Sequence, residues 1–340
     1  MSSAPAESSV VAESASAGWR ALPPEYAIPE RAPSLEQAQQ YCARLAHSHY
    51  ENFSVVTWFL PRHLHQHFYS VYAYCRISDD LGDEVGNAEQ SLALLDAWES
   101  ELNATYLSLV EPPRKDIRQN AEKLQAGAAG RNPVSPRHPV FIALRETIRK
   151  CDIPREPFAD LLTAFRQDQT VGRYPLFHDV LRYCRYSANP VGRLVLYICG
   201  YRDAERQQLS DHTCTALQLA NFWQDVAVDY AKGRIYLPLE SLAKYGVSED
   251  DIAQSRATPA FLEMMKFEVA RAREWFHKGL PLTEMVDKHL AIDIELFSRG
   301  GLEILNAIER QGYDVLTCRP AISKLRKLWL VARAARGKLL

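Results

Sequence analysis

Apolar residues recur every three or four positions along most of the chain from Ser34 onward. Because an α-helix has 3.6 residues per turn, this spacing places them on one face that can be buried. Clear examples are Leu92, Leu95 and Trp98, and further along Ala216, Leu219, Ala220 and Trp223. The alternation of a half-buried strand is nearly absent, and only the short stretch "RIYLP" resembles a strand. The pattern therefore predicts an all-α fold.

Two stretches interrupt this pattern. Residues 1–33 are rich in serine and alanine, and such a composition buries too little apolar surface to fold, so we expect a disordered leader. Residues 111–139 contain several prolines and glycines, which break a continuous helix. The helical pattern resumes after them, so they are interpreted as an excursion between helices. We expect one domain, residues 34–340, built as a single helical fold around a cavity.

A proline interrupts the apolar stretch "YCRYSANPVGRLVLY". Pro190 removes a backbone donor, so it either kinks a helix that runs through this stretch or marks the start of a new helix. In the second case Asn189 is the expected N-cap residue. The sequence leaves both interpretations open.

The charge balance argues against nucleic acid as a partner, because 40 basic side chains stand against 42 acidic ones. The seven cysteines show no CxxC spacing and are expected to be reduced thiols of a cytoplasmic protein. No uncharged stretch reaches the about 20 residues that a membrane-spanning helix needs, and the amino terminus lacks the features of a secretory signal.

The stretch "YCRISDDLGDE" carries an unusual density of carboxylates. If residues 67–84 form one helix, Asp79 and Asp83 share a face, with Arg76 one turn and Tyr72 two turns upstream. Like charges at this spacing destabilise a helix, so the group is either a solvated helix end or a binding site.

A second stretch, "LQLANFWQDVAVDYAKGRIYLP", repeats the spacing. Its polar residues Gln218, Asn221, Asp225 and Asp229 form one stripe on a predicted helix. Two such pairs that face each other suit Mg²⁺, which prefers oxygen ligands and is often bound together with phosphates. Zinc and di-iron sites are disfavoured, because neither stretch offers Cys or His at ligand spacing or a Glu-x-x-His motif.

Taken together, "FYSVYAYCRISDDLGDE", "YCRYSANPVG" and "LQLANFWQDVAVDYAKGRIYLP" resemble the squalene/phytoene synthase family. The resemblance extends from about Gln37 to about Val331 and implies the all-helical isoprenoid synthase fold. It also implies that two Asp-x-x-x-Asp motifs bind Mg²⁺ and a prenyl diphosphate. The residues carried over are Asp79, Asp83, Asp225 and Asp229 as metal ligands, with Tyr72, Arg76, Gln218 and Asn221 around the diphosphate.

Within the family, "SHYENFSV", "AFRQDQ" and "SANPVGRLVLY" are most similar to the bacterial hydroxysqualene synthases of the hopanoid pathway. This likeness implies the conversion of presqualene diphosphate and water to hydroxysqualene and diphosphate. The alternatives are head-to-head condensation of two prenyl diphosphates, to presqualene diphosphate, squalene or phytoene, and a non-catalytic assembly factor of the same fold.

Departures from the wider family disfavour the condensation. Members that join two diphosphates have Lys and Ser after the histidine where this chain has Glu51 and Asn52, and often Arg where it has Gln224. Fewer cations suit a reaction with one diphosphate. His49 and Asn52 are expected near the substrate. Glu51 either acts as general base for the attacking water or pairs with an arginine such as Arg76.

The carboxyl-terminal stretch "SKLRKLWLVARAARGKLL" is basic and has no acidic residue. A basic amphipathic end suits peripheral contact with anionic lipid of the inner membrane, close to a long-chain substrate and to partner enzymes of the pathway. The alternative is a terminal helix that packs on the core with a solvated basic face.

Overall fold

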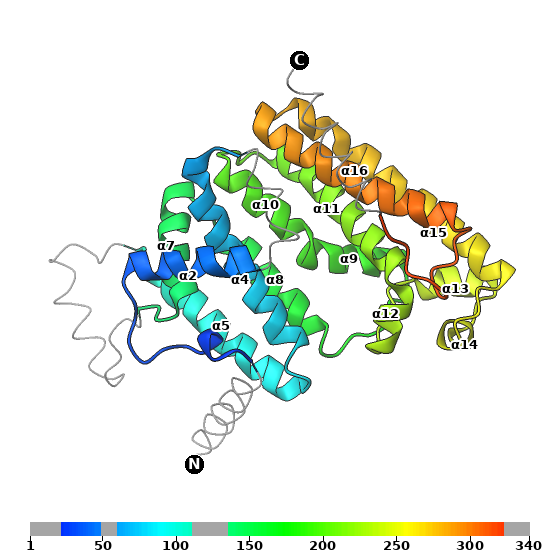
Figure 1. The fold of residues 1–340 in the computed structure, drawn as a ribbon, viewed down its shortest axis with the longest axis horizontal. Helices are drawn as coiled ribbons and strands as arrows, with labels where there is room; N and C mark the ends of the chain where they lie inside the picture. Colours follow the sequence, from blue (N-terminus) through cyan, green and yellow to red (C-terminus); the bar gives the residue numbers. More distant parts are fainter. Residues whose placement is uncertain (1–21, 49–59, 111–134, 323–340) are drawn as a thin grey trace, which may run out of the picture. The chain divides into compact units, whose positions relative to one another are not determined.

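The computed structural model describes residues 22–48, 60–110 and 135–322 (Figure 1). The chain divides into two compact units, one of residues 1–50 and 66–155 and the other of residues 51–65 and 156–340. The described part contains helices and no β-strand, which confirms the predicted all-α fold. The stretch "RIYLP" contributes only one isolated bridge, between Arg173 and Ile235. Whether the chain forms one domain after a leader stays a prediction.

Helices of the first unit surround a core of aromatic and aliphatic residues. Tyr74, Trp98 and Phe141, from three different helices, are fully buried with ring centroids 4.5–6.3 Å apart. The indole of Trp98 donates a hydrogen bond of 2.9 Å to Ser78, so its polar atom is satisfied inside the core. The elements are η1 (Pro24–Tyr26), α2 (Leu35–Ser48), α4 (His65–Asp83), α5 (Ala88–Leu107) and α7 (Pro139–Cys151).

The amino-terminal end of this unit includes residues that precede helix α2. Ser34 and Gln37 form a capping box at the start of α2, with hydrogen bonds of 2.9 and 3.2 Å between their side chains and backbone N–H groups. Ahead of it, Leu22 and Tyr26 are buried. Both side chains lie within the stretch that the sequence assigns to a leader, and the extent of that leader stays a prediction. Residues 1–21 lie outside the described part.

The second unit is built around α11, which packs against α10, α15 and α16 (Figure 1). Phe276 of α15 and Gly301 of α16 meet beside Leu217 of α11, where a side chain in place of Gly301 would collide with both neighbours. Glycine thus lets three helices approach closely. The elements are η2 (Arg62–Leu64), α8 (Glu156–Gln167), α9 (Phe177–Ser187), α10 (Asn189–Ile198), α11 (Ala204–Gln224), α12 (Val226–Ala231), α13 (Leu239–Tyr245), α14 (Glu249–Ala253), α15 (Pro259–Gly279), η3 (Leu280–Glu284) and α16 (Lys288–Arg310).

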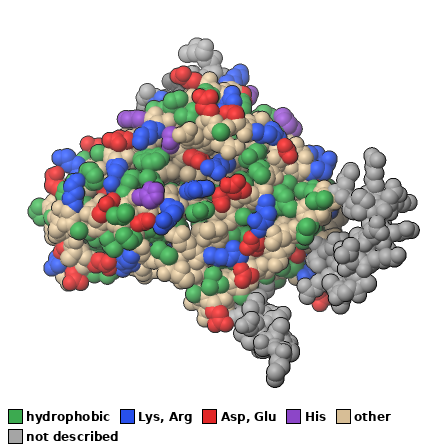
Figure 2. All heavy atoms as spheres, turned by 180° about the vertical axis from the view of Figure 1, so that it is seen from behind, with side chains coloured by type: hydrophobic (Ala, Val, Ile, Leu, Met, Phe, Trp, Pro, Cys, Tyr) green, Lys and Arg blue, Asp and Glu red, His purple; other side chains and the backbone are tan. Residues whose placement is uncertain are grey.

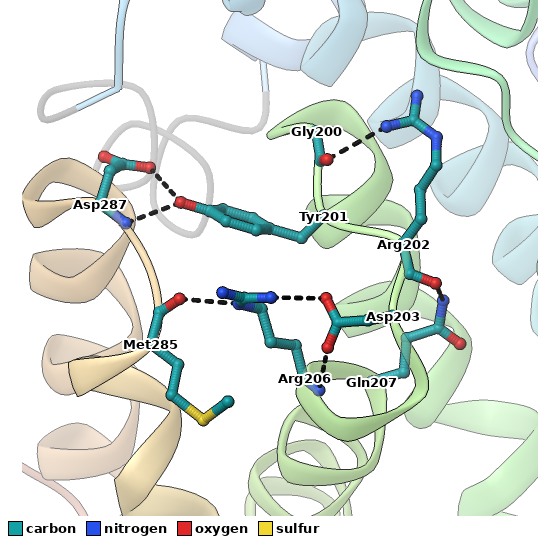
Figure 3. A network of polar contacts seen from close by, with 8 residues as sticks. All are labelled: Gly200, Tyr201, Arg202, Asp203, Arg206, Gln207, Met285 and Asp287. Carbon is teal, nitrogen blue, oxygen red and sulfur yellow. Dashed lines mark hydrogen bonds and ion pairs between the residues drawn. The ribbon is translucent and has the colours of Figure 1, made fainter.

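A network of hydrogen bonds connects the start of α11 with the start of α16 (Figure 3). The hydroxyl of Tyr201 accepts a hydrogen bond of 2.8 Å from the backbone N–H of Asp287, the N-cap residue of α16. Arg206 donates to the carbonyl of Met285 at 2.7 Å, and its guanidinium lies 4.9 Å from the centre of the Tyr201 ring. These contacts fix both helix ends in register.

Pro190 marks a helix start. Helix α9 ends at Ser187 and α10 begins at Asn189, with the proline in the first turn, where its missing N–H costs nothing. The N-cap residue is Ala188, one position earlier than expected, and it offers no side-chain cap. The side chain of Asn189 instead accepts a hydrogen bond of 3.0 Å from Thr215 of α11.

None of the helices in the described residues combines the length and hydrophobicity required to cross a bilayer. Figure 2 shows one face, on which basic and acidic side chains of the described residues are interspersed. This mixture agrees with the nearly neutral balance in the sequence.

Candidate active site

The first pair of carboxylates lies in the last two turns of α4. The helix spans His65–Asp83, close to the predicted 67–84, and Asp79 and Asp83 are both exposed. Their spacing of four residues places them on one face, as the sequence indicated. Arg76 and Tyr72, one and two turns upstream, are half-buried on the same helix.

Arg76 is held by a third carboxylate that sequence reasoning did not single out. Its Nε donates a hydrogen bond of 3.0 Å to Asp80, and its Nη2 donates to the other oxygen of the same carboxylate. The hydroxyl of Tyr26 also donates to Asp80, at 2.9 Å. Asp80 is only 5% exposed, so these three donors satisfy a buried charge. The signal in the sequence was the four-residue spacing of Arg76 and Asp80.

These contacts fix the charge state of the arginine and of the tyrosines. Burial alone would lower the pKa of Arg76, but the carboxylates of Asp80 and Asp79 hold it above its usual value. Burial raises the pKa of Tyr26, and the Asp80 charge raises it further. Burial likewise raises the pKa of Tyr72. The first motif thus presents a permanent cation, whose Nη1 lies 3.9 Å from Asp79, beside neutral phenols.

The second pair spans a break between two helices. Asp225 ends α11 with φ −107° and ψ 17°, outside helical geometry, and Asp229 lies in the short helix α12. The backbone hydrogen bonds nevertheless continue, from Asp225 to Asn221 at 2.9 Å and from Asp229 to Asp225 at 2.8 Å. The predicted stripe therefore exists but bends at Asp225. Within it Gln218 is half-buried and Asn221 is exposed.

A segment from far along the chain covers Asp225. The guanidinium of Arg319 donates to both carboxylate oxygens, from Nε and from Nη2 at 3.0 Å. Next to it the buried side chain of Gln224 donates to the carbonyl of Pro320. Sequence reasoning missed Arg319, because nothing in a local pattern relates residues 94 positions apart.

A group of stacked rings lies beside the second motif. Phe222 stacks on Tyr236 with ring centroids 3.8 Å apart, and Tyr183 lies 5.5 Å from the same ring. The hydroxyl of Tyr183 donates a hydrogen bond of 2.7 Å to Asp168. Arg234 links this group to the motif, because its N–H donates to the carbonyl of Asp229 and its guanidinium to that of Asp168.

The side chains of the two motifs suit a hard divalent cation as metal ligands. All four motif side chains are carboxylates, the ligand type that Mg²⁺ prefers. In the described ranges no three His, Cys, Asp or Glu side chains gather at one point, so each pair has to be completed by other ligands. The pairs belong to different units, and the expectation that they face each other stays a prediction. His49, Glu51 and Asn52 lie outside the described residues.

The helical arrangement and the carboxylate pairs define the class of protein first. The structure superimposes on the crystal structure of squalene synthase HpnC from Alicyclobacillus acidocaldarius with a TM-score of 0.71 and 44% identity, over 87% of this chain and 98% of that one. The fold is thus the all-α isoprenoid synthase fold of squalene synthases.

Sequence comparisons then give the family. Residues 46–326 match the squalene/phytoene synthase family, and the chain belongs to it. A hydroxysqualene synthase from Rhodopseudomonas palustris is 31% identical over 250 residues, which are 72% of this chain and 75% of that protein. A 15-cis-phytoene synthase from Synechococcus elongatus is 29% identical over 319 residues, 89% of this chain and 94% of that protein. The predicted family is confirmed.

Proposed function

We propose that the chain converts presqualene diphosphate and water into hydroxysqualene and diphosphate with the help of Mg²⁺. The observation that carries the proposal is the state of Gln224. This position often holds arginine in family members that join two diphosphates, but here a neutral, buried amide is bonded to the Pro320 carbonyl. A site with one cation fewer is less suited to two diphosphates at once. The likeness to the Rhodopseudomonas hydroxysqualene synthase supports the same reaction.

Different residues are proposed to act on the leaving diphosphate and on the attacking water. The C–O bond to diphosphate breaks with its electron pair on the leaving group, and the carbocation rearranges until a water oxygen bonds to it and releases a proton. Arg76, oriented by Asp80, is proposed to neutralise the departing charge. Mg²⁺ bound by the Asp pairs would supply Lewis-acid stabilisation of the same charge. The Glu51 carboxylate is proposed to accept the proton of the water.

Two separate incubations test the reaction. Presqualene diphosphate alone should give hydroxysqualene with Mg²⁺, no product with EDTA, and product again when Mg²⁺ is restored. Farnesyl diphosphate alone should give no C30 product. Formation of presqualene diphosphate or squalene from farnesyl diphosphate would contradict the proposal and favour the condensation, for which the likeness to the phytoene synthase speaks. A protein inactive on every diphosphate, with both motifs intact, would favour the non-catalytic assembly factor.

A single substitution tests the proposed role of Glu51. Glu51→Gln keeps the size of the side chain and removes the base, so presqualene diphosphate should still be consumed while the product shifts toward elimination products or rearranged alcohols. Glu36→Gln, an exposed acid of α2, is the matched control for the loss of one charge. An unchanged product distribution at an unchanged rate would rule the role out.

Two further proposals concern the surroundings of the enzyme. We propose that it works in the cytoplasm and contacts the inner membrane through its basic carboxyl terminus, which lies outside the described residues. Sedimentation with vesicles that contain anionic lipid tests this contact. Removal of residues 324–340 should abolish co-sedimentation, and persistence of binding would contradict the proposal.

A further inference from the structure

The contact between Arg319 and Asp225 occupies the carboxylate that the proposed function needs as a metal ligand. The guanidinium binds both oxygens of Asp225. The Asp225 side chain is 24% exposed and that of Arg319 is 55% exposed, so the arginine covers the carboxylate from the solvent side. The hydrogen bonds to Asp225 raise the pKa of Arg319, and the charge of Asp229 acts in the same direction.

The segment around Arg319 is held in place on both sides. Asp314 accepts hydrogen bonds from the backbone N–H groups of Leu316 and Thr317, at 3.1 and 3.0 Å, and from the Thr317 hydroxyl at 2.6 Å. The side chain of Gln311 donates to the carbonyl of Cys318 at 2.8 Å. On the other side, Gln224 donates to the carbonyl of Pro320. The backbone before and after Arg319 is therefore fixed, and the guanidinium is directed at Asp225.

This arrangement cannot coexist with a cation bound directly to Asp225. A divalent ion needs the lone pairs of the carboxylate oxygens, and both oxygens already accept hydrogen bonds from the guanidinium. The two positive charges would also repel each other at this distance. Entry of a metal ion at Asp225 thus requires the guanidinium to withdraw. The exposure of Arg319 allows this by rotation of its own side chain, without any change in the helices.

We propose that Arg319 competes with the divalent cation for Asp225. It pairs with Asp225 in the metal-free chain and leaves this carboxylate when the cation enters. The inference rests on the proposed function in one respect, namely that Asp225 is a metal ligand. Its consequence is that the second motif binds metal more weakly than its two carboxylates alone would. In the first motif Arg76 donates two hydrogen bonds to Asp80, and its Nη1 lies 3.9 Å from Asp79.

Direct titration with Mn²⁺, followed by the electron paramagnetic resonance signal of the free ion without any diphosphate, tests the proposal. Asp79→Asn with Asp83→Asn serves as background, so that only the second motif is measured. In this background Arg319→Gln should bind Mn²⁺ about two- to five-fold more tightly, the range expected for loss of an exposed ion pair. Arg319→Lys should stay near the parent protein, because it restores the charge.

Arg256→Gln is the matched control. Arg256 is 53% exposed and pairs with Asp251 at 2.9 Å, so its replacement removes the same charge and a similar ion pair elsewhere in the second unit. It should leave Mn²⁺ binding unchanged. Equal affinities of the Arg319→Gln and Arg256→Gln proteins would overturn the competition while leaving the proposed function standing. No Mn²⁺ binding in the background protein or in either variant would instead overturn the metal role of Asp225 itself, and the competition with it.

Discussion

The two carboxylate motifs have the same spacing but obtain their cationic partner in different ways. In the first motif the arginine comes from the same helix, one turn away from Asp80, and this buried carboxylate also accepts a hydrogen bond from Tyr26. In the second motif the arginine comes from a segment 94 residues later and lies at the surface. The first cation is a fixed part of its site, whereas the second is attached reversibly. Identical sequence motifs can therefore differ in what has to move before a ligand binds.

The largest expected effect is common to both motifs and concerns turnover. Asp79→Ala and Asp225→Ala should each lower turnover of the diphosphate substrate by about 10³-fold or more, since each removes a proposed metal ligand. Stability should change by less than about 0.5 kcal/mol, because both carboxylates are at least partly exposed. Product formation and urea unfolding measure the two quantities. Near-wild-type turnover in either variant would remove that motif from the active site.

Asp80→Ala should lower the free energy of unfolding far more than Asp225→Ala does. The substitution leaves Arg76, which is one-third exposed, and the Tyr26 hydroxyl without their acceptor, at a cost of about 3 kcal/mol of unfolding free energy. Asp225→Ala removes the corresponding partner of Arg319 and should cost almost nothing. Urea unfolding of the two variants compares them directly. Equal losses of unfolding free energy would show that the burial of Asp80 does not make its ion pair stronger than that of Asp225.

Another buried carboxylate, Asp293, lies outside both motifs and differs from Asp80 in its hydrogen bonding. Asp293 of α16 is 2% exposed, and within the described residues neither of its oxygens has a hydrogen-bond partner. Burial, together with the charge of Asp287, raises its pKa from 3.8 to about 8. The folded chain therefore holds a proton that the unfolded chain releases above about pH 4, so stability falls as the pH rises from about 4 to about 8.

Replacement of Asp293 by asparagine should remove this loss. Asp293→Asn is expected to raise the unfolding free energy at pH 8 by about 2 kcal/mol and to flatten its dependence on pH. Asp80→Asn should do the opposite at pH 8, because it discards a charge that three donors satisfy. Unfolding curves at several pH values measure both. A stability of Asp293→Asn that is lower than wild type at pH 8 would contradict the prediction.

The smallest expected effects concern Tyr26 and the leader. Tyr26→Phe removes one hydrogen bond to Asp80 and should lower the free energy of unfolding by about 1 kcal/mol.

Deletion of residues 2–21 should leave the melting temperature within a degree or two, whereas deletion of residues 2–30 also takes away the buried Leu22 and Tyr26 and should lower it clearly. Equal melting temperatures for the two deletions would contradict the prediction that the buried Leu22 and Tyr26 stabilise the fold.

Local patterns in the sequence predicted much of this arrangement. The helix considered over residues 67–84 agrees with α4 to within two residues at each end, and Ser34 followed three residues later by Gln37 is a sequence signature of a helix start that α2 realises. Both depend on residues within a turn or two of one another. The position of Asp79 and Asp83 on one face of α4 could be predicted for the same reason.

Features that arise from distant parts of the chain could not be predicted. The bend at Asp225 lies where a loop beyond α16 binds the end of α11, and no periodicity within α11 marks it. The burial of Tyr26 depends on Asp80, 54 residues later, and its own neighbours have the composition of a leader. Asp80 itself could have been found, since it follows Arg76 by four residues, but three neighbouring carboxylates made it look like one more exposed acid.

The short helix α12 gives the second motif a mechanical property that the first lacks. Asp83 is the end of a continuous rod of nineteen residues, so its direction is set by the whole of α4. Asp229 lies beyond Asp225, whose backbone is non-helical, in a six-residue helix whose only buried residue is Val226. Because octahedral coordination by Mg²⁺ tolerates little error in ligand angle, a rigid pair sets the position of an ion and an adjustable pair adapts to it. The non-helical backbone at Asp225 makes the second motif the pair whose ligand directions can adapt to an ion.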